Sequence, residues 1–458
     1  MFDTKIYEKR RALLKQRIGK GKILLLGNQE SPINYRDNCY HFRQDSTFLY
    51  YTGLSKPGLH LLIDVDQDLD ILFGEELTIH DIIWTGHVPS LKDMALSAGI
   101  RKVASLSQLS DHIIPDISYL PPYRAEHTSY LATLLGKSQR EVEQQYDIAL
   151  AKAIIAERLI KTDDEIKEMH QAVDRSYDMH KAAMAATHPS HKESILVGKA
   201  ADISSSSGAS FAYPPILTTR GEVLHNHDHH RMMKSGDLVL ADMGCESDLY
   251  YAGDITRTWP VDGQFTTKQK EVYSIVLDAY NASVAALRAG VLFKDVHLKA
   301  AKVIASGLKD LDIIQVDPEE AVALGAHTIF FPHGLGHMIG LDVHDMENIG
   351  EDLVGYTEDI QRDMRFGFRS LRLGKELEEG HTITIEPGIY FISDLINLRK
   401  SEKEYDGVIN YQVLEKYHDL GGIRIEDNYL ITKDASEIIG NNSLPRNPEE
   451  VAQLVGTD

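Results

Sequence analysis

Two apolar runs that each end on a carboxylate constrain the fold of this chain more than any other feature. LVLADMG carries Asp242 and ITIEPG carries Glu386, and each acid follows one glycine by six residues and precedes another by two. Short apolar runs bounded by glycines are typical of buried strands. We therefore predict two similar buried strands, each of which presents one carboxylate at the same position along its length.

Each of these runs is followed by a second acid close to an arginine. Asp254 stands three residues before Arg257, and Glu426 stands two residues after Arg424. The repeated pattern has two interpretations. It is either a chance similarity of two short strands or an ancient duplication in which each half gives two acids to one shared centre.

Acids inside apolar strands require compensation, because an unpaired buried carboxylate is neutralised or avoided. Pairing with arginine or with backbone donors would satisfy any one of these acids, but the lysines and arginines in the runs cannot balance four. Divalent cations would balance them. Four carboxylates with one imidazole form an oxygen-rich ligand set that suits Mn²⁺ or Co²⁺. Two cations bridged by Asp and Glu would hold a hydroxide for hydrolysis.

Histidines are concentrated in the segment PHGLGHMIGLDVHD. It places His333, His337 and His344 within twelve residues, among glycines that allow the backbone to approach closely. A single histidine is more often a structural residue than a ligand, but three around a glycine-rich turn favour a functional site. The run HNHDHH at 225–230 is typical of a solvated loop. There we single out His225, which follows the apolar pair VL.

Composition and motifs exclude several other classes of protein. The formal charge is −21, from 48 Lys and Arg against 69 Asp and Glu, which disfavours nucleic acid and membrane surfaces as partners. The sequence has no HExxH, GxxxxGK[ST] or GxSxG pattern. Cys39 and Cys245 have neither metal-type nor disulfide spacing, and no apolar run reaches the roughly 18 residues of a membrane span. The first residues lack the apolar core of a signal peptide, so we predict a cytoplasmic protein.

A chain of 458 residues is too long for one ordinary core, so two domains are expected. A helix over 5–18 and a set of short apolar runs predict an α/β first domain. The strand-like runs are 23–28, 48–54, 59–65 and 70–73. Capping boxes at Ser138 and at Thr162 each begin a helix, the first of which continues to about Leu159.

Two helix starts so close together place a domain boundary near 158–162. We therefore predict domains over 1–160 and 161–458. In the second domain, SGDLVLADMG and YAGDITRTWPVDG read as strands. A helix follows Thr266 to about Ala289, and another covers 294–309. The polar stretches 346–365 and 393–420 read as long surface insertions.

At these residues the sequence resembles the proline-specific peptidases of the pita-bread fold, the aminopeptidase P and prolidase family. The matching blocks are NYRDNCYHFRQDSTFLYYTGL, LVLADMGCESDLYYAGDITRTWP, FFPHGLGHMIGLDVHD, TITIEPGIYFI and GGIRIED. Five blocks in the same order cover nearly the whole chain. The resemblance implies an α/β N-terminal domain followed by an α+β pita-bread catalytic domain.

The family's metal ligands correspond to Asp242, Asp254, His337, Glu386 and Glu426. The resemblance implies two divalent metal ions, for which we expect Mn²⁺, with Co²⁺ or Zn²⁺ as alternatives. The interval between the two aspartates is one residue longer than in some relatives, and we expect a bulge there that leaves the ligands in place.

The resemblance also implies roles for residues around the metals. His225 and His344 would bind substrate oxygens and stabilise the developing oxyanion, and His333 matches a further active-site histidine. Glu386 would also move a proton between the attacking hydroxide and the leaving proline nitrogen. Arg424 would orient the metal-bound acids.

The implied substrate is a peptide with proline in the second position. An X–Pro bond has no N–H, so a peptidase that binds its substrate through this group cannot form the hydrogen bond. Metals that polarise the carbonyl do not need the N–H. The block YRDNCYHFRQDS favours an Xaa-Pro aminopeptidase. The block FRSLRLGKELEEGHTITIEPGIYFI favours an Xaa-Pro dipeptidase (prolidase), because Arg372 matches an arginine that holds the free carboxylate of the substrate. A surface arginine in a polar insertion is the other interpretation of Arg372. We expect the aminopeptidase, with the dipeptidase as the alternative.

Two further expectations follow from the resemblance. A non-catalytic pita-bread module that binds peptide is a third alternative, against which the complete ligand set argues. We expect a homodimer or homotetramer, in which Trp84 would extend over the substrate cleft of a neighbouring subunit. A half-buried structural tryptophan is the other interpretation of Trp84.

Overall fold

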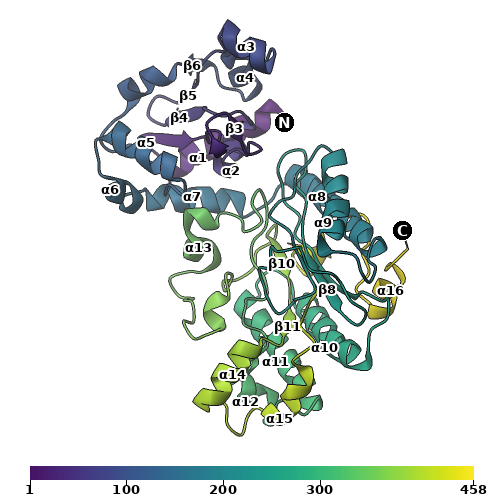
Figure 1. Cartoon of the computed structure of the whole chain (residues 1–458). Helices are drawn as coiled ribbons and strands as arrows, with labels where there is room; N and C mark the ends of the chain where they lie inside the picture. The colour runs from purple at the N-terminus through teal and green to yellow at the C-terminus, as the bar shows by residue number, and fades with distance from the viewer. Residues whose placement is uncertain (458) are drawn as a thin grey trace. The chain divides into compact units, whose positions relative to one another are not determined.

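The computed structural model describes residues 1–457, which form two compact units (Figure 1). Unit 1 comprises Met1–Arg158 and the short segment Met346–Leu353. Unit 2 comprises Leu159–Asp345 and the chain from Val354 onward. The chain therefore crosses between the units after Arg158, after Asp345 and after Leu353. Among the described residues, no helix has the length and apolar character needed to cross a membrane.

Unit 1 is built on a four-stranded sheet with the order β1-β4-β5-β6. Its strands are β1 (Lys22–Leu26), β4 (His60–Asp64), β5 (Leu69–Phe73) and β6 (Lys102–Ala104). The first three strands pair antiparallel, and β5 and β6 pair parallel. Every residue of β4 is buried, as an uninterrupted apolar run predicts. A separate hairpin consists of β2 (Pro32–Tyr35) and β3 (Asn38–Cys39).

In unit 1, α1 packs against α2 and α7, while α2 contacts β1 and α4 contacts β6. The helices of this unit are α1 (Thr4–Ile18), α2 (Ser46–Thr52), α3 (Ile79–Thr85), α4 (Leu91–Ser97), α5 (Ala125–Leu135), α6 (Gln139–Gln144) and α7 (Ile148–Arg158), with the 3₁₀ helix η1 (Leu106–His112). The predicted helix at 5–18 is confirmed by α1. The predicted strands at 23–28, 59–65 and 70–73 are confirmed by β1, β4 and β5.

The predicted strand at 48–54 is wrong, because this segment forms helix α2. Asp45 caps the helix by accepting a hydrogen bond from the Phe48 N–H at 2.8 Å, and Gly53 ends it in the left-handed conformation at φ 67°. All seven residues of α2 are buried. A helix that is buried on every side has no polar face, so its sequence cannot be told from that of a buried strand.

The helix predicted from Ser138 to about Leu159 is two helices. The capping box at Ser138 is present, but α6 ends at Gln144. Asp147 then accepts hydrogen bonds from the N–H groups of Ala149 and Leu150 at 2.8 and 3.1 Å, and so begins α7. An aspartate inside a helical apolar pattern therefore marks a new N-terminus here.

The described part of unit 2 contains three antiparallel sheets. The first has the order β7-β8-β9, from β7 (Ile216–Thr218), β8 (Leu238–Asp242) and β9 (Thr256–Pro260). The second is β10-β13-β14 and the third β11-β12, from β10 (Thr382–Ile385), β11 (Gly388–Tyr390), β12 (Gly422–Arg424), β13 (Asp427–Ile431) and β14 (Ser436–Ile438). The two predicted strands are confirmed by β8 and β9. A single bridge between Thr256 and Glu426 joins the first sheet to the chain between β12 and β13.

Helices pack against these sheets, and α10 contacts β10, β11 and β12. The helices are α8 (Asp163–Ala185), α9 (Glu193–Ser206), α10 (Thr267–Val284), α11 (Phe293–Asp310), α12 (Pro318–Leu324), α14 (Ser393–Glu402), α15 (Tyr411–Leu414) and α16 (Pro448–Gln453), with the 3₁₀ helices η2 (Ala326–Ile329), η3 (Phe368–Ser370) and η4 (Glu415–Tyr417). The capping boxes at Thr162 and Thr266 are confirmed, although α10 ends at Val284 rather than near Ala289. The helix predicted over 294–309 is confirmed by α11.

The two stretches predicted as surface insertions are partly buried. Met346 and Ile349 are fully buried around the start of α13 (Glu347–Gly355), which kinks at Gly350. In the second stretch, Ile409 and Leu414 are buried. Single apolar residues, spaced among many charged ones, are the buried positions of both stretches. The average polarity of a stretch does not show such isolated positions.

Candidate metal centre

Four acids stand at equivalent places in two strand pairs of unit 2. Asp242 is the last residue of β8, and Glu386 directly follows β10. Asp254 lies two residues before β9, and Glu426 lies one residue before β13. Because β8 pairs with β9 and β10 pairs with β13, each antiparallel pair brings two carboxylates to the same end. This geometry is the one that the repeated sequence pattern predicts.

The bulge expected between the two aspartates is absent from this part of the described chain. Asp242 pairs with Thr256 in β8 and β9, and the same register continues outward to a bridge between Glu246 and Ala252. The hairpin then closes in a tight turn where Tyr250 adopts a left-handed backbone at φ 69°. The regular pairing holds both aspartates in place, as that expectation also required.

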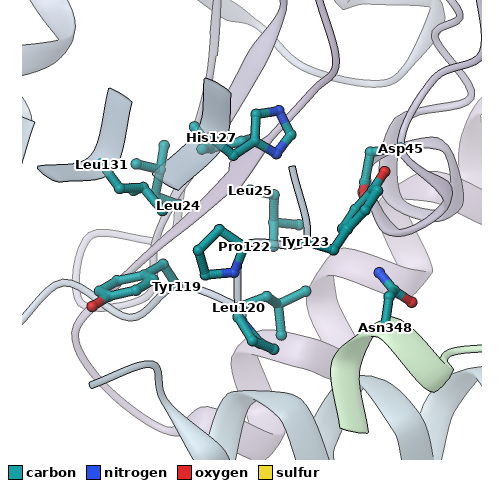
Figure 2. Close-up of a pocket in the computed structure, with 12 residues that line it drawn as sticks. Leu24, Leu25, Asp45, Tyr119, Leu120, Pro122, Tyr123, His127, Leu131 and Asn348 are labelled. Atoms are coloured by element: carbon teal, nitrogen blue, oxygen red, sulfur yellow. The ribbon is translucent and has the colours of Figure 1, made fainter. Parts of the chain in front are cut away.

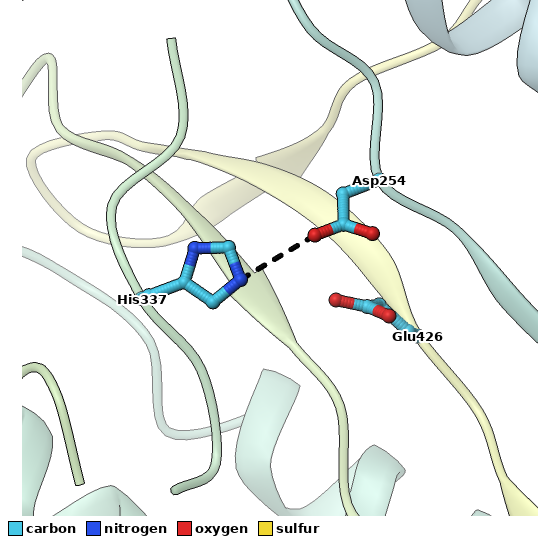
Figure 3. Close-up of side chains that lie close together, drawn as sticks. All are labelled: Asp254, His337 and Glu426. Carbon is cyan, nitrogen blue, oxygen red and sulfur yellow. Dashed lines mark ion pairs between the residues drawn. The ribbon is translucent and has the colours of Figure 1, made fainter. Parts of the chain in front are cut away.

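His337 faces these acids. Its Nε2 lies 3.4 Å from Oδ2 of Asp254 and 3.6 Å from Oε1 of Glu386. Its Nδ1 lies 3.0 Å from the carbonyl oxygen of Met338, so Nδ1 carries a proton and Nε2 is the nitrogen that faces the acids. Figure 3 shows Asp254, His337 and Glu426 pointing toward one another, with potential ligand atoms that all lie within 4.8 Å of each other.

Two arginines lie close to the acids, and they do different things. Arg424 donates to Asp242 and, at 2.7 Å, to the Tyr390 hydroxyl. Arg257 instead forms a fully buried ion pair with Asp427 at 2.8 Å and donates to the backbone carbonyl of Glu426 at 2.7 Å. Arg424 therefore neutralises one of the four carboxylates, whereas the charge of Arg257 is balanced by Asp427, which is not one of the four.

The remaining negative charge is not compensated by protein groups. Thr256 donates to Oε2 of Glu426 at 2.7 Å, but Oε1 is buried and has no hydrogen-bond partner among the residues described. An unsatisfied buried carboxylate oxygen is costly. Oxygen donors without a protein partner, beside an imidazole nitrogen, are a donor set that fits a divalent cation.

Electrostatics leads to the same conclusion. Burial raises the pKa of Glu386 to about 7 and raises the pKa of Glu426 well above its ordinary range. Burial also raises the pKa of Asp242, against the opposing effect of Arg424. Burial acts to raise the pKa of Asp254 as well, but the hydrogen bond and charge of His337 hold it below its usual value. Such a cluster does not ionise fully at neutral pH unless cations are bound.

These residues line a cavity of about 480 Å³. His225 and His344 line it, and the His344 ring stacks on His337 with ring centres 3.8 Å apart. His333 also lines it, with Nε2 2.8 Å from the Tyr390 hydroxyl and Nδ1 3.7 Å from Oε2 of Glu386. The sequence-predicted site residues of unit 2, Asp242, Asp254, His337, Glu386, Glu426, His225, His333, His344, Arg424 and Arg372, all lie at its wall.

Sequence reasoning missed three residues of this cavity and its surroundings. The Tyr213 hydroxyl lies within hydrogen-bond distance of both Asp242 and Asp254, at 2.6 and 2.5 Å. Tyr390 contacts both Arg424 and His333. His227 lines the cavity, although the histidine run that contains it reads as a solvated loop. No local pattern marks the tyrosines, because their partners are distant in sequence.

Comparisons with known proteins agree with this geometry. The model of metallopeptidase family M24 matches residues 167–433, and that of the aminopeptidase P N-terminal domain matches residues 7–119. A probable Xaa-Pro aminopeptidase of Sordaria macrospora is 32% identical and covers 95% of this chain and 91% of its own length. A probable Xaa-Pro aminopeptidase of Botryotinia fuckeliana is 31% identical, over 95% of this chain and 92% of its own.

Solved structures are similar over the whole chain. Aminopeptidase P of Escherichia coli with the inhibitor Pro-Leu is 28% identical, with a TM-score of 0.81 over 99% of this chain and 98% of its own. Proline aminopeptidase P II of Yersinia pestis is 27% identical, with the same TM-score over 99% and 100%. Zinc-substituted E. coli aminopeptidase P in complex with product is 28% identical, again with a TM-score of 0.81.

The chain belongs to metallopeptidase family M24 and, within it, to the aminopeptidase P family. Its architecture is the aminopeptidase P type N-terminal domain followed by the pita-bread catalytic domain. It is a metal-dependent peptidase. The expectations for the fold, the family and the enzyme class are confirmed.

Proposed function

We propose that this chain is an Xaa-Pro aminopeptidase, which releases the N-terminal residue ahead of proline by two-metal hydrolysis. The observation that carries the proposal is a cavity wall with three buried carboxylates, the half-buried carboxylate of Glu386 and one imidazole, in which Oε1 of Glu426 has no partner in the described structure. The relatives named Xaa-Pro aminopeptidase extend over nearly the whole chain, which supports the same activity.

The proposed metal ligands are Asp242, Asp254, His337, Glu386 and Glu426, and the proposed metal is Mn²⁺. The preference for Mn²⁺ over Zn²⁺ rests on four oxygen donors against one nitrogen. When bound, the two cations supply the Lewis acidity that polarises the scissile carbonyl and lowers the pKa of the attacking water.

The protein's own groups then orient the substrate and move the proton. Glu386 has Oε1 beside His337 and Oε2 3.7 Å from His333, so it is placed to take a proton at one oxygen and return it to the proline nitrogen. His225 and His344, at the cavity wall, donate to substrate oxygens as negative charge develops there. Arg424 holds the Asp242 carboxylate in one orientation.

Proline in the second position suits this arrangement for a physical reason. The nitrogen of an X–Pro bond carries no hydrogen, so recognition through a peptide N–H is impossible at that site. Polarising the carbonyl does not depend on that hydrogen. The proposed chemistry therefore acts on a bond that peptidases of other designs bind poorly.

An Xaa-Pro dipeptidase is the second candidate. Arg372 and Ser370 line the cavity that contains the carboxylate cluster, and a guanidinium there can hold the free carboxylate of a dipeptide. Incubation with Gly-Pro and with a longer X-Pro-Y peptide, with and without Mn²⁺, separates the candidates. Cleavage of the longer peptide, with or without cleavage of Gly-Pro, supports the aminopeptidase, and cleavage of Gly-Pro alone supports the dipeptidase. Cleavage of neither in Mn²⁺-loaded protein would leave a peptide-binding module.

We also propose a homodimer or homotetramer, on the basis of helix α3. Ile79, Ile83 and Trp84 of this helix are between 72% and 78% exposed, and large apolar side chains exposed together on one short helix are a feature of interaction sites. In the proposal a second copy covers it, and Trp84 lies over the cavity of that copy. Trp84→Ala should then raise KM and weaken assembly, while Tyr35→Ala, an exposed aromatic on β2, should do neither. An unchanged KM in a monodisperse oligomer would end this idea.

A cytoplasmic location is the last part of the proposal. Cys39 and Cys245 are both free thiols in the structure. Burial raises the pKa of Cys245 to about 11, so this thiol is unreactive. Free thiols without disulfides are usual for proteins of reducing compartments. Activity in a fractionated cell lysate checks the location.

A further inference from the structure

Unit 2 contains a fully buried ion pair outside the carboxylate cluster. Nζ of Lys161 lies 3.0 Å from Oδ2 of Asp345, and each side chain is 1% exposed. Removing two charges from water is expensive, and such a pair is weak evidence for stability, because well-packed apolar residues often do as well. We therefore expect the pair to serve the local geometry rather than stability.

Both partners stand beside places where the chain crosses between the units. Lys161 follows the crossing after Arg158 by three residues, and Asp345 is the last residue before the second crossing. The backbone of Lys161 is fixed, because its N–H donates to the Gly380 carbonyl at 2.9 Å and Thr162 directly after it caps α8. The ion pair thus ties the loop that ends at Asp345 to a rigid point of unit 2.

The first arm of this loop is held without the ion pair. It runs along β10, where Thr384 N–H donates to the His337 carbonyl at 3.0 Å and Ile339 N–H donates to the Thr382 carbonyl at 3.1 Å. Strand pairing of this kind fixes the position of His337. Loss of the ion pair should therefore leave His337 in place.

The returning arm, which carries His344, depends on Asp345. The backbone N–H of Asp345 donates to the Met338 carbonyl at 3.0 Å, and Oδ1 accepts from the Asp342 N–H at 3.3 Å. The turn before this arm also packs directly on the pair, since a Cβ on Gly340 would collide with the Asp345 carboxylate and lie 2.8 Å from Cε of Lys161. The Asp345 carboxylate therefore connects the turn before His344 to the ammonium group of Lys161.

We propose that Lys161 and Asp345 are positioning residues that hold His344 over His337 and so align it for the reaction. This inference rests on the proposed catalytic role of His344. The ring of His344 is stacked 3.8 Å from that of His337, so a shift of the returning arm moves His344 relative to the substrate while the metal ligand stays. Turnover, rather than metal binding, is the property that the pair controls.

The first test is Lys161→Met, which removes the charge and keeps the length of the side chain. We expect kcat to fall roughly tenfold to a hundredfold, the effect of a displacement of about 1 Å, with unchanged KM and Mn²⁺ content. Lys161→Arg should recover most of the rate. Arg11→Met, which breaks a buried ion pair with Asp70 in unit 1, is the matched control and should lower stability without changing kcat.

The decisive measurement is a double-mutant cycle with His344→Ala. If the lysine acts through His344, Lys161→Met should cause no further loss of kcat in the His344→Ala background. Losses that multiply, or loss of Mn²⁺ in Lys161→Met alone, would overturn the inference. Should Lys161→Met fail to fold, Asp345→Asn enters the same cycle with the same two outcomes. A wild-type protein that cleaves no X-Pro peptide refutes the proposed function, and the inference falls with it.

Discussion

Glu426 and Asp427 are neighbours in sequence and have opposite electrostatic surroundings. Successive residues of a strand point to opposite faces, and at this point of the chain the two faces differ in charge. The Asp427 carboxylate forms ion pairs with Arg257, at 2.8 Å, and with Arg446. It also accepts a hydrogen bond from the Tyr280 hydroxyl at 2.7 Å. Although burial acts against it, these arginines hold the pKa of Asp427 at about 2. Its charge is fully compensated by the protein.

Glu426 lies among acids instead. Burial and the charges of Asp254, Glu386 and Asp242 raise its pKa far above the ordinary range, and one of its oxygens lacks a partner within the described chain. The groups that surround a buried acid therefore distinguish two kinds of site. An acid surrounded by arginine and tyrosine donors supports the fold, whereas an acid surrounded by acids is a place where a cation binds.

The largest effect is expected on the side of Glu426. Asp254→Asn removes one negative ligand from the cluster, so metal occupancy and turnover should fall together. The loss of turnover should exceed the roughly tenfold to hundredfold effects of groups that only orient ligands. Elemental analysis and peptide hydrolysis check this. Two metals and near-normal activity in the variant would remove Asp254 from the centre.

The matched change on the other side is Asp427→Asn. It leaves the buried Arg257 and the half-buried Arg446 without their anion, which should destabilise the fold by roughly 3–5 kcal/mol. Metal content per folded chain should stay at the wild-type value, because Asp427 faces away from the cluster. Denaturant unfolding measures the first quantity, and elemental analysis of the folded fraction measures the second. Loss of metal without loss of stability would reverse the assignment of the two faces.

A smaller effect is expected at His344, which touches the cluster through His337. His344→Ala should keep the metals and lower turnover by roughly a hundredfold to a thousandfold, the contribution of one oxyanion-type donor. Steady-state kinetics with metal analysis on the same sample checks both. A variant that loses metal would make His344 a ligand and the choice of His337 wrong.

The smallest effect concerns pH. Metal-free protein holds protons on the cluster at pH 7, because burial raises the pKa of Glu386 to about 7 and raises that of Glu426 well above its ordinary value. Mn²⁺ needs these carboxylates ionised, so binding should release protons and weaken as the pH falls, by up to about tenfold per pH unit for each proton released. Calorimetric titrations at pH 6, 7 and 8 in two buffers measure the release. An affinity that is independent of pH would contradict the assignment of raised pKa values.

The sequence predicted the acids well because a carboxylate at the end of an apolar run is a local signal. This signal marks Asp242 and Glu386, a nearby arginine marks Asp254 and Glu426, and the structure brings all four acids to one cavity. What could not be predicted is the partner of each arginine. Arg257 stands three residues from Asp254, yet its partner is Asp427, 170 positions away.

The same limit explains the other differences. Tyr213 lies 29 and 41 positions from the two aspartates that it joins, and no periodicity shows such a contact. The sequence of helix α2 predicts a strand, because in a uniformly buried segment the apolar residues show no helical periodicity. Local patterns therefore predicted the elements that carry charge, and tertiary contacts decided how those charges are paired.

Calorimetric titration of metal-free protein with Mn²⁺, together with thermal unfolding at several Mn²⁺ concentrations, decides whether the carboxylates around Glu426 form a two-metal centre. We expect two Mn²⁺ per chain and a melting temperature that rises with Mn²⁺ concentration, because the folded state alone assembles the ligands. Asp427→Asn should bind the same two ions, and Asp254→Asn should bind fewer. Wild-type protein that binds no Mn²⁺ and melts at the same temperature with and without it would contradict the presence of this centre.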